Sequence, residues 1–437
     1  MKRHLLLALA ASLSLFAQAQ TQMELSAREV SALMAPGWNL GNTMEAAKTW
    51  EGVALYNNKG GVGSETAWQP TKTTQAVIDF VKSQGFRSVR IPCAWVLGHI
   101  SDAQAYTIDK AWMARVKEVV DYCINADLYV VLNDHWDGGW LEEHIKDSGA
   151  TKTKNQEVLK AIWTQIAEVF KDYDERLLFA GLNEPNADNQ AATNNLVEYE
   201  QIFIDAVRST GGNNAQRVLI VQGPNTDIDK TNSYYNTLPK DPATDRLMVE
   251  VHYYTPYQFT MMEKDESWGK YMNYWGTGNN PGNSARYYNN GEAEMERLLK
   301  KMKTKFVDKG IPVYIGEYAA NWKNVSGAGE SQEKHDASIK LFHQKMVEYC
   351  MSMGMVPVVW DTNNTSRPCM TVIDRRNGGS VYSQPMMEGI REGMAAHISP
   401  VISPPSSSAV YDLQGRKVCG TPANGIYIQD GRKFVVR

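Results

Sequence analysis

Two glutamates follow apolar segments of the chain and are the first candidates for chemistry. Glu184 stands directly after LLFAGLN (residues 177–183), and Glu317 lies within PVYIGEYAA (residues 312–320). A carboxylate at the end of a buried strand loses solvation, so it is usually paired or functional there. Two facing carboxyl groups have the chemistry to break a glycosidic bond, one as proton donor and the other as nucleophile. Taken alone, Glu184 fits a loop residue that faces water equally well.

The pair would need a particular geometry and particular charges. In a retaining enzyme the two carboxyl groups lie only ~5–5.5 Å apart, so that the nucleophile reaches the anomeric carbon directly. Burial and a like-charged neighbour are expected to raise the pKa of the acid, and a cation is expected to keep the nucleophile ionised. Arg90, inside SVRIPCAW (residues 88–95), is the candidate cation. From its position alone, a structural ion pair is an equally good interpretation of Arg90.

Other polar and aromatic side chains stand at the ends of further apolar segments. Each has a plain structural alternative, because a lone histidine is often a hydrogen-bonded core residue and tryptophan is a bulky core former. Independent structural roles would not require all of them to fall at positions of one type. The coincidence favours a single site that contains Arg90, His135, Asn183, Glu184, His252, Tyr254, Glu317 and Trp360.

The elements that must position these side chains alternate regularly. Segments with helical spacing, notably 192–210, 292–307 and 331–353, separate most of the apolar ones, whereas 226–245 predicts an irregular connection with at most a short helix. This alternation predicts a closed (β/α)₈ TIM barrel, with all strand carboxyl ends on one face. A doubly wound open sheet is the alternative, but GWNLGNT lacks the GxGxxG turn. The eight predicted strand segments are 37–43, 88–95, 128–136, 177–186, 217–225, 247–256, 312–320 and 355–364.

Composition and motifs exclude several other classes of protein. The net charge of −4 and the absence of a basic stripe argue against a nucleic-acid partner. Metal ligation by His135, His252 and Asp134 or Asp137 lacks an HExxH motif, and a Ser-His-Asp site lacks GxSxG. We therefore expect neither a metal nor a cofactor. The cysteines have no CxxC spacing and are best interpreted as small buried thiols, with one or two disulfides left open: Cys93, Cys123, Cys350, Cys369 and Cys419.

The two ends of the chain differ from its body. Residues 1–19 combine a basic start, an apolar run too short to span a membrane and an Ala-Gln-Ala cleavage pattern, which predicts a signal peptide. Residues 23–397 are the predicted catalytic barrel, and residues 398–408 have the composition of a Pro/Ser linker. Residues 409–437 predict a short β-rich tail with a hairpin turn at Asp430-Gly431. We expect an exported, monomeric protein without a membrane span.

The sequence resembles the family 5 glycoside hydrolases, the cellulase family of (β/α)₈ barrels in clan A. The resemblance rests on a combination of motifs in family order: SVRIPCAW, NDHW, GLNEPN, VHYYTPYQF, IGEYAAN and VVWDTNN. It implies that Glu184 is the general acid/base and Glu317 the nucleophile of a retaining hydrolase. It also implies contacts for six other residues: Arg90 and Tyr254 at the nucleophile, Asn183 at the sugar 2-hydroxyl, His252 beside the acid/base, and His135 and Trp360 at the cleaving subsite.

The resemblance also narrows the substrate. GNTMEA and ETAW are most similar to the branch with endoglucanases, lichenases and xyloglucanases, which implies a secreted endo-β-1,4-glucanase acting on cellulose, mixed-linkage glucan and xyloglucan. A β-mannanase or xylanase of the same mechanism and a non-catalytic glycan-binding barrel are the alternatives. Trp136 departs from the family, which often has a second histidine there. Five tryptophans in predicted loops fit outer subsites and plain loop packing equally well: Trp68, Trp140, Trp268, Trp275 and Trp322.

The tail GIYIQDGRKFVVR resembles the C-terminal sorting signals of the type IX secretion system of Bacteroidetes. This resemblance implies that the secretion machinery is a partner of the tail and that the protein is secreted or lies at the cell surface. A small carbohydrate-binding module is the alternative, but about thirty residues bury little surface on their own.

Overall fold

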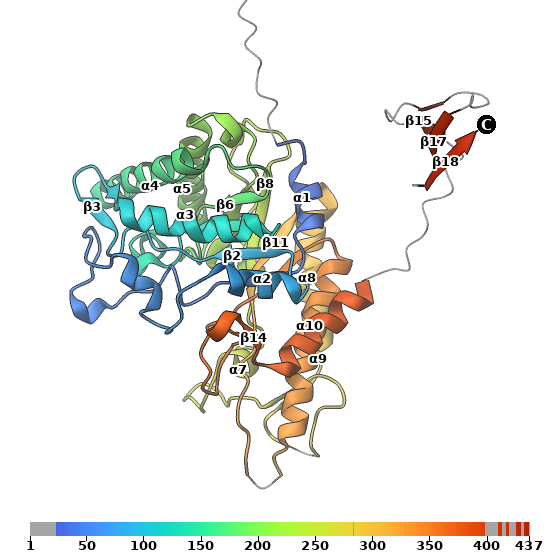
Figure 1. The fold of residues 1–437 in the computed structure, drawn as a ribbon. Helices are drawn as coiled ribbons and strands as arrows, with labels where there is room; N and C mark the ends of the chain where they lie inside the picture. Colours follow the sequence, from blue (N-terminus) through green and yellow to red (C-terminus); the bar gives the residue numbers. More distant parts are fainter. Residues whose placement is uncertain are drawn as a thin grey trace, which may run out of the picture.

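The computed structural model describes residues 23–282, 284–327 and 329–397, and the backbone of four short strands between residues 410 and 436. Eight parallel strands close into a barrel (Figure 1), which confirms the predicted (β/α)₈ architecture. Each strand lies within one of the eight apolar segments. In spatial order they are β1 (Gly37–Asn39), β12 (Val356–Val359), β11 (Val313–Tyr318), β8 (Leu247–Tyr253), β7 (Leu219–Gln222), β6 (Leu177–Ala180), β5 (Tyr129–Asn133) and β2 (Ser88–Ile91).

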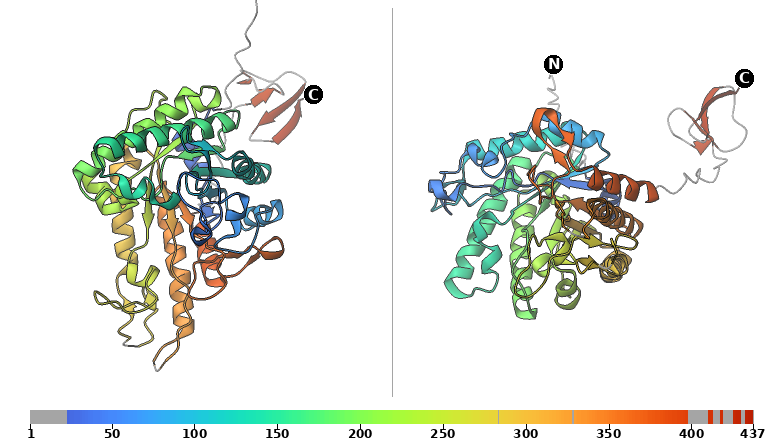
Figure 2. Two further views of the ribbon diagram at one scale, coloured as in Figure 1. Left: turned by 90° about the vertical axis from the view of Figure 1, so that its left-hand side faces the viewer. Right: turned by 90° about the horizontal axis from the view of Figure 1, so that it is seen from below.

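Helices occupy the crossovers between the strands and surround the barrel (Figure 2). The crossover from β7 to β8 holds only α6 (Ile228–Tyr234), as the irregular composition of residues 226–245 predicts. The other helices are α1 (Ala27–Leu33), α2 (Gln75–Ser83), α3 (Lys110–Asn125), α4 (Gly149–Phe170), α5 (Gln190–Ser209), α7 (Tyr257–Thr260), α8 (Gly291–Lys305), α9 (Gln332–Ser352) and α10 (Gln384–His397).

This barrel is larger than the ~250 residues typical of the fold because several of its loops are long. Three two-stranded sheets, parallel or antiparallel, lie in these loops. They are β3 (Ile100–Asp102) with β4 (Thr107–Ile108), β9 (Tyr274–Trp275) with β10 (Tyr287–Tyr288), and β13 (Ile373–Asp374) with β14 (Ser380–Val381). The tail forms a four-stranded sheet in the order β16 (Lys417–Val418), β15 (Val410–Asp412), β17 (Gly425–Gln429) and β18 (Arg432–Val436).

Two layers of core hold the barrel together. Apolar side chains between strands and helices form the larger one. Inside the barrel, Leu178, Ile220, Met248 and Tyr314 belong to a second apolar cluster, which Val30 of α1 covers. Because successive strand residues point to opposite faces, the inward positions nearer the carboxyl ends form a separate layer. That layer is polar and carries the site described below.

Strand β6 ends earlier than the predicted segment 177–186. Gly181 still donates to Ile220 O over 3.1 Å, but the next amide, Leu182 N, donates to the side chain of Gln222 over 2.9 Å. A Cβ at Gly181 would come within 2.8 Å of the Phe203 ring, so only glycine fits where the chain leaves the sheet. Glu184 therefore lies in the loop after β6 rather than at the strand tip.

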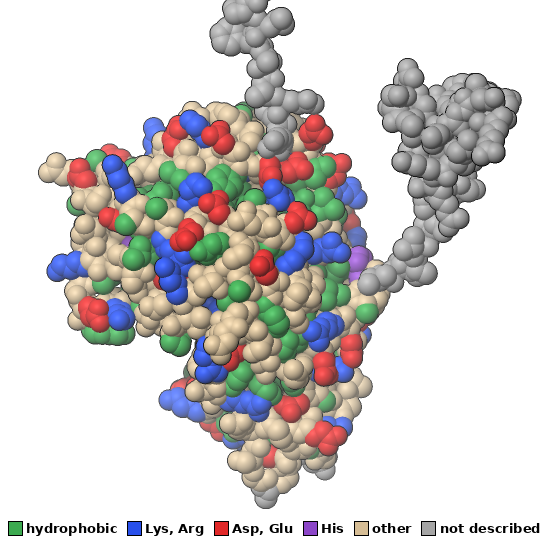
Figure 3. All heavy atoms as spheres, viewed as in Figure 1, with side chains coloured by type: hydrophobic (Ala, Val, Ile, Leu, Met, Phe, Trp, Pro, Cys, Tyr) green, Lys and Arg blue, Asp and Glu red, His purple; other side chains and the backbone are tan. Residues whose placement is uncertain are grey.

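The described part of the chain has a surface of mixed charge and buried thiols. Basic and acidic side chains are interspersed on the face in Figure 3. Within the described residues, no helix combines the length and apolar character needed to cross a membrane. Cys93, Cys123, Cys350 and Cys369 are free and buried, as predicted. Cys419, the signal peptide, the linker and the turn at residues 430–431 lie outside the described residues.

Candidate active site

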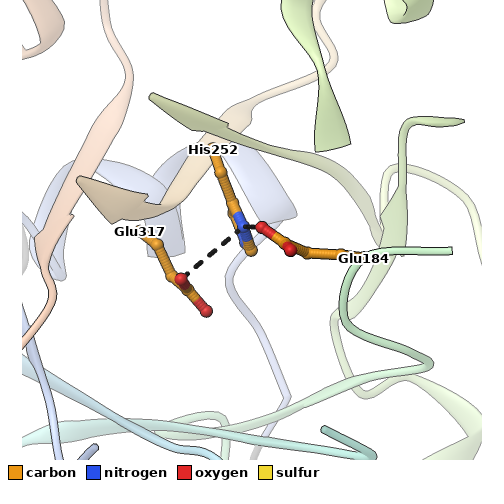
Figure 4. Close-up of side chains that lie close together, drawn as sticks. All are labelled: Glu184, His252 and Glu317. Carbon is orange, nitrogen blue, oxygen red and sulfur yellow. Dashed lines mark hydrogen bonds and ion pairs between the residues drawn. The ribbon is translucent and has the colours of Figure 1, made fainter. Parts of the chain in front are cut away.

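The eight predicted site residues come together at the carboxyl end of the barrel. Their side chains form a continuous set of contacts that begins at Glu317 and ends at Glu184 and Trp360. One carboxylate oxygen of Glu184, one ring nitrogen of His252 and one carboxylate oxygen of Glu317 all lie within 4.8 Å of one another. Figure 4 shows His252 pointing between the two carboxylates, with its ring facing both. This separation corresponds to the direct-attack geometry of a retaining glycosidase rather than to the wider spacing of an inverting one.

Glu317 is held by two donors and is almost fully buried. Arg90 Nη1 donates to Glu317 Oε1 and Tyr254 Oη to Glu317 Oε2, both over 2.9 Å. Burial and the charge of Glu317 raise the pKa of Tyr254 well above its ordinary value, so the phenol keeps its proton and remains a donor. The register of β11 against β8 shifts between Ile315 and Glu317, and this irregularity places Glu317 opposite His252. The carboxylate is therefore fixed in one orientation.

Glu184 has a more open setting. Its side chain is 41% exposed, whereas that of His252 is 3% exposed. The two groups share a hydrogen bond of 2.7 Å between Glu184 Oε1 and His252 Nδ1. An exposed carboxyl with a buried partner is accessible to a substrate and to a proton source at once.

The protonation of this pair differs from the prediction. Burial lowers the pKa of His252, but the charge of Glu317 and the hydrogen bonds to Glu184 and Glu250 outweigh it and raise the value to about 10. Loss of solvation raises the pKa of Glu184, but the hydrogen bond and charge of His252 lower it below the ordinary value. The predicted raised pKa of Glu184 is therefore wrong for the free protein. The lowered pKa of Glu184 and the raised pKa of His252 favour an ionised carboxylate facing a protonated imidazole in the free protein.

Asn183, His135 and Trp360 complete the wall of the site. Asn183 Oδ1 accepts from Arg90 Nη2 over 2.9 Å, which fixes the direction of the amide. Burial, together with the charges of Arg90 and His252, lowers the pKa of His135 far below its ordinary value, so this imidazole is neutral. Its ring stacks on Trp360, with centroids 5.6 Å apart and planes at 6°.

Two further carboxylates border the site and were not predicted from the sequence. Glu250 of β8 lies beneath Arg90 and His252. Glu142, in the short 3₁₀ helix Glu142–His144, accepts from Asn183 Nδ2 and from Glu184 N, each over 3.2 Å. Burial and the charge of Glu184 raise the pKa of Glu142 to about 7. An acidic residue inside the run LMVEVHYY was a signal for Glu250, but nothing in WLEEH distinguishes Glu142 from a loop residue.

Carboxylates and histidine are also metal ligands, so the donor set needs a chemical test. The three groups that face one another are already engaged: His252 Nδ1 bonds to Glu184, and both oxygens of Glu317 accept from Arg90 and Tyr254. The positive charges of Arg90 and protonated His252 disfavour a metal cation at this position. Proton transfer fits this arrangement better than metal ligation.

The five loop tryptophans divide into two groups. Trp140, Trp275 and Trp322 are buried, and Trp275 packs against Phe259 and Phe342, so the packing interpretation holds for these three. Trp68 and Trp268 are exposed. Trp68 lines a cavity of about 210 Å³ together with Asn42 and Asn364.

A second cavity, of about 280 Å³, adjoins the exposed carboxylate. Glu184, His252, Tyr254 and Tyr257 are among its lining residues, and Glu317 is not. A proton donor lies on the side of the leaving group, because its proton goes to the glycosidic oxygen. If Glu184 is the proton donor that the sequence predicts, this cavity is on the leaving-group side of the site. The ring centroid of the exposed Trp268 lies 5.9 Å from that of Tyr257.

Comparison with known proteins agrees with the resemblance found in the sequence motifs. The family model described as cellulase (glycosyl hydrolase family 5) matches residues 51–366. A xyloglucan-specific endo-β-1,4-glucanase of Bacteroides ovatus is 36% identical over 362 residues, which cover 81% of this chain and 68% of that protein. Endoglucanase A of Paenibacillus barcinonensis is 33% identical over 399 residues, covering 86% of this chain and 92% of that protein.

Solved structures are similar over the same region. The crystal structure of a family 5 xyloglucan-specific β-1,4-glucanase from a ruminal metagenomic library, in complex with XXLG, aligns with a TM-score of 0.76 at 44% identity. The alignment covers 86% of this chain and 98% of that one. With the family model spanning most of the barrel and these identities over most of the chain, the protein belongs to glycosyl hydrolase family 5, the cellulase family, and is a glycoside hydrolase.

Proposed function

We propose that this glycoside hydrolase is a retaining endo-β-1,4-glucanase that cleaves β-1,4-linked glucans, xyloglucan among them. The proposal rests mainly on one observation: carboxylate oxygens of Glu184 and Glu317 lie within 4.8 Å of each other at the barrel mouth, and a ring nitrogen of His252 lies within the same distance of both. The endoglucanase and xyloglucanase relatives support the substrate class.

In the first step of the proposed reaction, a Glu317 oxygen attacks the anomeric carbon while the glycosidic C–O bond breaks. The departing oxygen takes a proton from Glu184, and His252 Nδ1 supplies that proton through the 2.7 Å hydrogen bond. In the second step, Glu184 and His252 take a proton from water as its oxygen attacks the anomeric carbon, and the ester to Glu317 breaks. Each group thereby returns to its starting state.

The remaining predicted residues have supporting roles in this proposal. Arg90 and Tyr254 orient Glu317 by their two hydrogen bonds, and Asn183 presents its amide to the sugar 2-hydroxyl. Trp360, stacked on His135, offers a flat apolar surface under the sugar at the cleaving subsite. Neutral His135 donates or accepts a hydrogen bond there without adding charge.

Rates on a panel of polysaccharides test the substrate. Carboxymethyl cellulose, mixed-linkage glucan, xyloglucan, xylan and glucomannan are compared by release of reducing ends. The proposal expects the three glucans to be cleaved fastest. A preference for xylan or mannan would assign the same mechanism to another polysaccharide, and no release from any polymer would support a glycan-binding barrel.

Trp268→Ala is expected to weaken binding of long substrates. Trp268 is 61% exposed and lies beside Tyr257 of the leaving-group cavity, so its ring can cover sugars that extend beyond that cavity. Loss of one stacked aromatic contact, roughly 0.5–1.5 kcal/mol, corresponds to about a 2- to 13-fold rise in KM for polymer.

An aryl cellobioside is the discriminating substrate, because its sugars fill only the glycone side. Its KM is expected to stay unchanged in Trp268→Ala. Trp50→Ala is the matched control, because Trp50 is 74% exposed and lines neither cavity. An equal change in KM for both substrates, or the same change in Trp50→Ala, would contradict a role in binding long chains.

Export is also part of the proposal. The composition of residues 1–19 and the tail at residues 409–437 support secretion or display at the cell surface. The N-terminus of the protein recovered outside the producing cells is expected after Ala19, and deletion of residues 409–437 is expected to stop its release without lowering glucanase activity in cell lysates. A recovered protein that begins at Met1 would contradict cleavage.

A further inference from the structure

Glu250 is a fully buried carboxylate inside the barrel, on the strand that carries His252. Its Oε1 lies 3.1 Å from Arg90 Nε and 3.3 Å from His252 Nε2, and its Oε2 accepts from Gln222 Nε2 over 2.7 Å. The backbone above it is fitted to it, because a Cβ at Gly316 would overlap the Glu250 carboxylate. A buried charge is strongly unfavourable unless it is paired and hydrogen-bonded, and here every partner belongs to the barrel interior.

The two cations that Glu250 contacts are those that reach the reacting carboxylates. Arg90 uses Nη1 for Glu317 and Nη2 for Asn183, which leaves Nε for Glu250. His252 uses Nδ1 for Glu184, which leaves Nε2 for Glu250. Glu250 thus forms an ion pair with the inner side of Arg90 and shares a hydrogen bond with the inner nitrogen of His252, and the outer donors of both cations face the reacting carboxylates.

We propose that Glu250 is a positioning residue for the cleavage reaction: its carboxylate holds Arg90 against Glu317 and keeps the proton of His252 on the nitrogen that faces Glu184. The inference rests on the proposed roles of Glu184 and Glu317. Glu250 itself lies beneath Arg90 and His252 and acts through them.

The charges around His252 determine whether loss of the Glu250 charge favours or disfavours protonated His252. Two cations, Arg90 and His252, stand among three carboxylates, and removing the charge of Glu250 takes away one of the three groups that favour protonated His252. Burial raises the pKa of Glu250, but Arg90 and His252 lower it below its ordinary value, so Glu250 is ionised when the enzyme works. The groups that face Glu250 and His252 from the surrounding elements are Arg90, His135, Glu184, Gln222, Tyr254, Tyr314 and Glu317.

Glu250→Gln removes the charge at nearly constant volume. An opposite charge at this distance shifts a pKa by about 1–3 units, so the alkaline limb of the kcat/KM profile is expected to move to lower pH by about that amount. We expect kcat to fall on the order of 10- to 100-fold, the range seen when supporting groups behind metal ligands are removed. KM is expected to stay the same, because Glu250 does not touch substrate.

Two further variants separate positioning from mere packing. Glu250→Asp keeps the charge, so its alkaline limb is expected close to that of the wild type while kcat falls by a smaller factor. Glu200→Gln is the matched control: Glu200 is equally buried, accepts from Gln222 N over 2.8 Å and from Tyr235, and contacts neither Arg90 nor His252. Its pH profile is expected to coincide with that of the wild type.

A Glu250→Gln protein with a lower Tm but the kcat and pH profile of the wild type would overturn the proposal and leave Glu250 a structural residue. A profile displaced equally in Glu200→Gln would overturn it as well. If Glu250→Gln does not fold, wild-type kcat in Glu250→Asp has the same meaning. A wild-type protein without glucanase activity would instead contradict the proposed function, so the two failures are distinguishable.

Discussion

Glu317→Gln is expected to lower kcat on soluble glucan on the order of 10⁴-fold or more, while the protein stays folded and still binds oligosaccharide. An amide is a very poor nucleophile toward the anomeric carbon, so no glycosyl-enzyme ester forms. The fold tolerates the change because the amide has nearly the same shape and its oxygen still accepts from Arg90 or Tyr254. An unpaired Tyr254 hydroxyl would cost about 1–3 kcal/mol and an unpaired Arg90 donor more, which circular dichroism and thermal melting measure.

Glu330→Gln is the matched control for this change. Glu330 lies in the connection between β11 and α9, where it accepts from Tyr274 and Asn273 and contacts none of the eight site residues. Its activity is expected to equal that of the wild type. Wild-type turnover by Glu317→Gln would show that Glu317 is not the nucleophile.

Glu184→Ala is expected to lower kcat on polysaccharide by about 10²–10⁴-fold, the usual contribution of a positioned acid or base. The size of the loss depends on the leaving group. A dinitrophenolate departs without a proton, so the first step with dinitrophenyl cellobioside is expected to stay fast in this variant. The glycosyl-enzyme then accumulates, because no base activates the attacking water.

Azide makes this prediction specific, because the anion attacks the anomeric carbon without needing a base. Added azide is expected to accelerate Glu184→Ala on the dinitrophenyl substrate and to yield the β-glycosyl azide, with no effect on the wild type. A loss of the same size on polymer and on dinitrophenyl cellobioside, without azide rescue, would show that Glu184 does not transfer the proton.

The barrel was predictable because each of its strands is a buried apolar run and each crossover has helical spacing. Closing eight such units brings the strand ends to one face, so the meeting of Glu184, His252 and Glu317 followed from topology alone. The end of β6 was less predictable. Only glycine fits at position 181, because Phe203 of α5 occupies the space of a side chain, and the next amide bonds to the side chain of Gln222.

The protonation state of Glu184 could not be predicted from sequence patterns. Burial and like charge predict a raised pKa for Glu184, but the sign reverses because His252 donates a hydrogen bond over 2.7 Å. Two further features of the site are the shifted register of β11, which places Glu317 opposite His252, and the contact of Glu250 with the inner side of the His252 ring, and residue spacing encodes neither. The buried tryptophans illustrate the same limit, since Trp275 looks like a loop residue until its packing on Phe259 is known.

Trapping the covalent glycosyl-enzyme would identify the nucleophile directly. The probe is a cellobioside with fluorine at C2 of the glucosyl unit that is cleaved and with an activated leaving group. The fluorine slows both steps, and the leaving group makes the first step fast again, so the glycosyl-enzyme persists. Mass spectrometry of the proteolysed adduct is expected to place one fluoroglycosyl group on the peptide that contains Glu317, in the wild type and not in Glu317→Gln. An adduct on any other residue, or glucan hydrolysis that proceeds with inverted configuration and no adduct, would contradict the assignment of Glu317 as nucleophile.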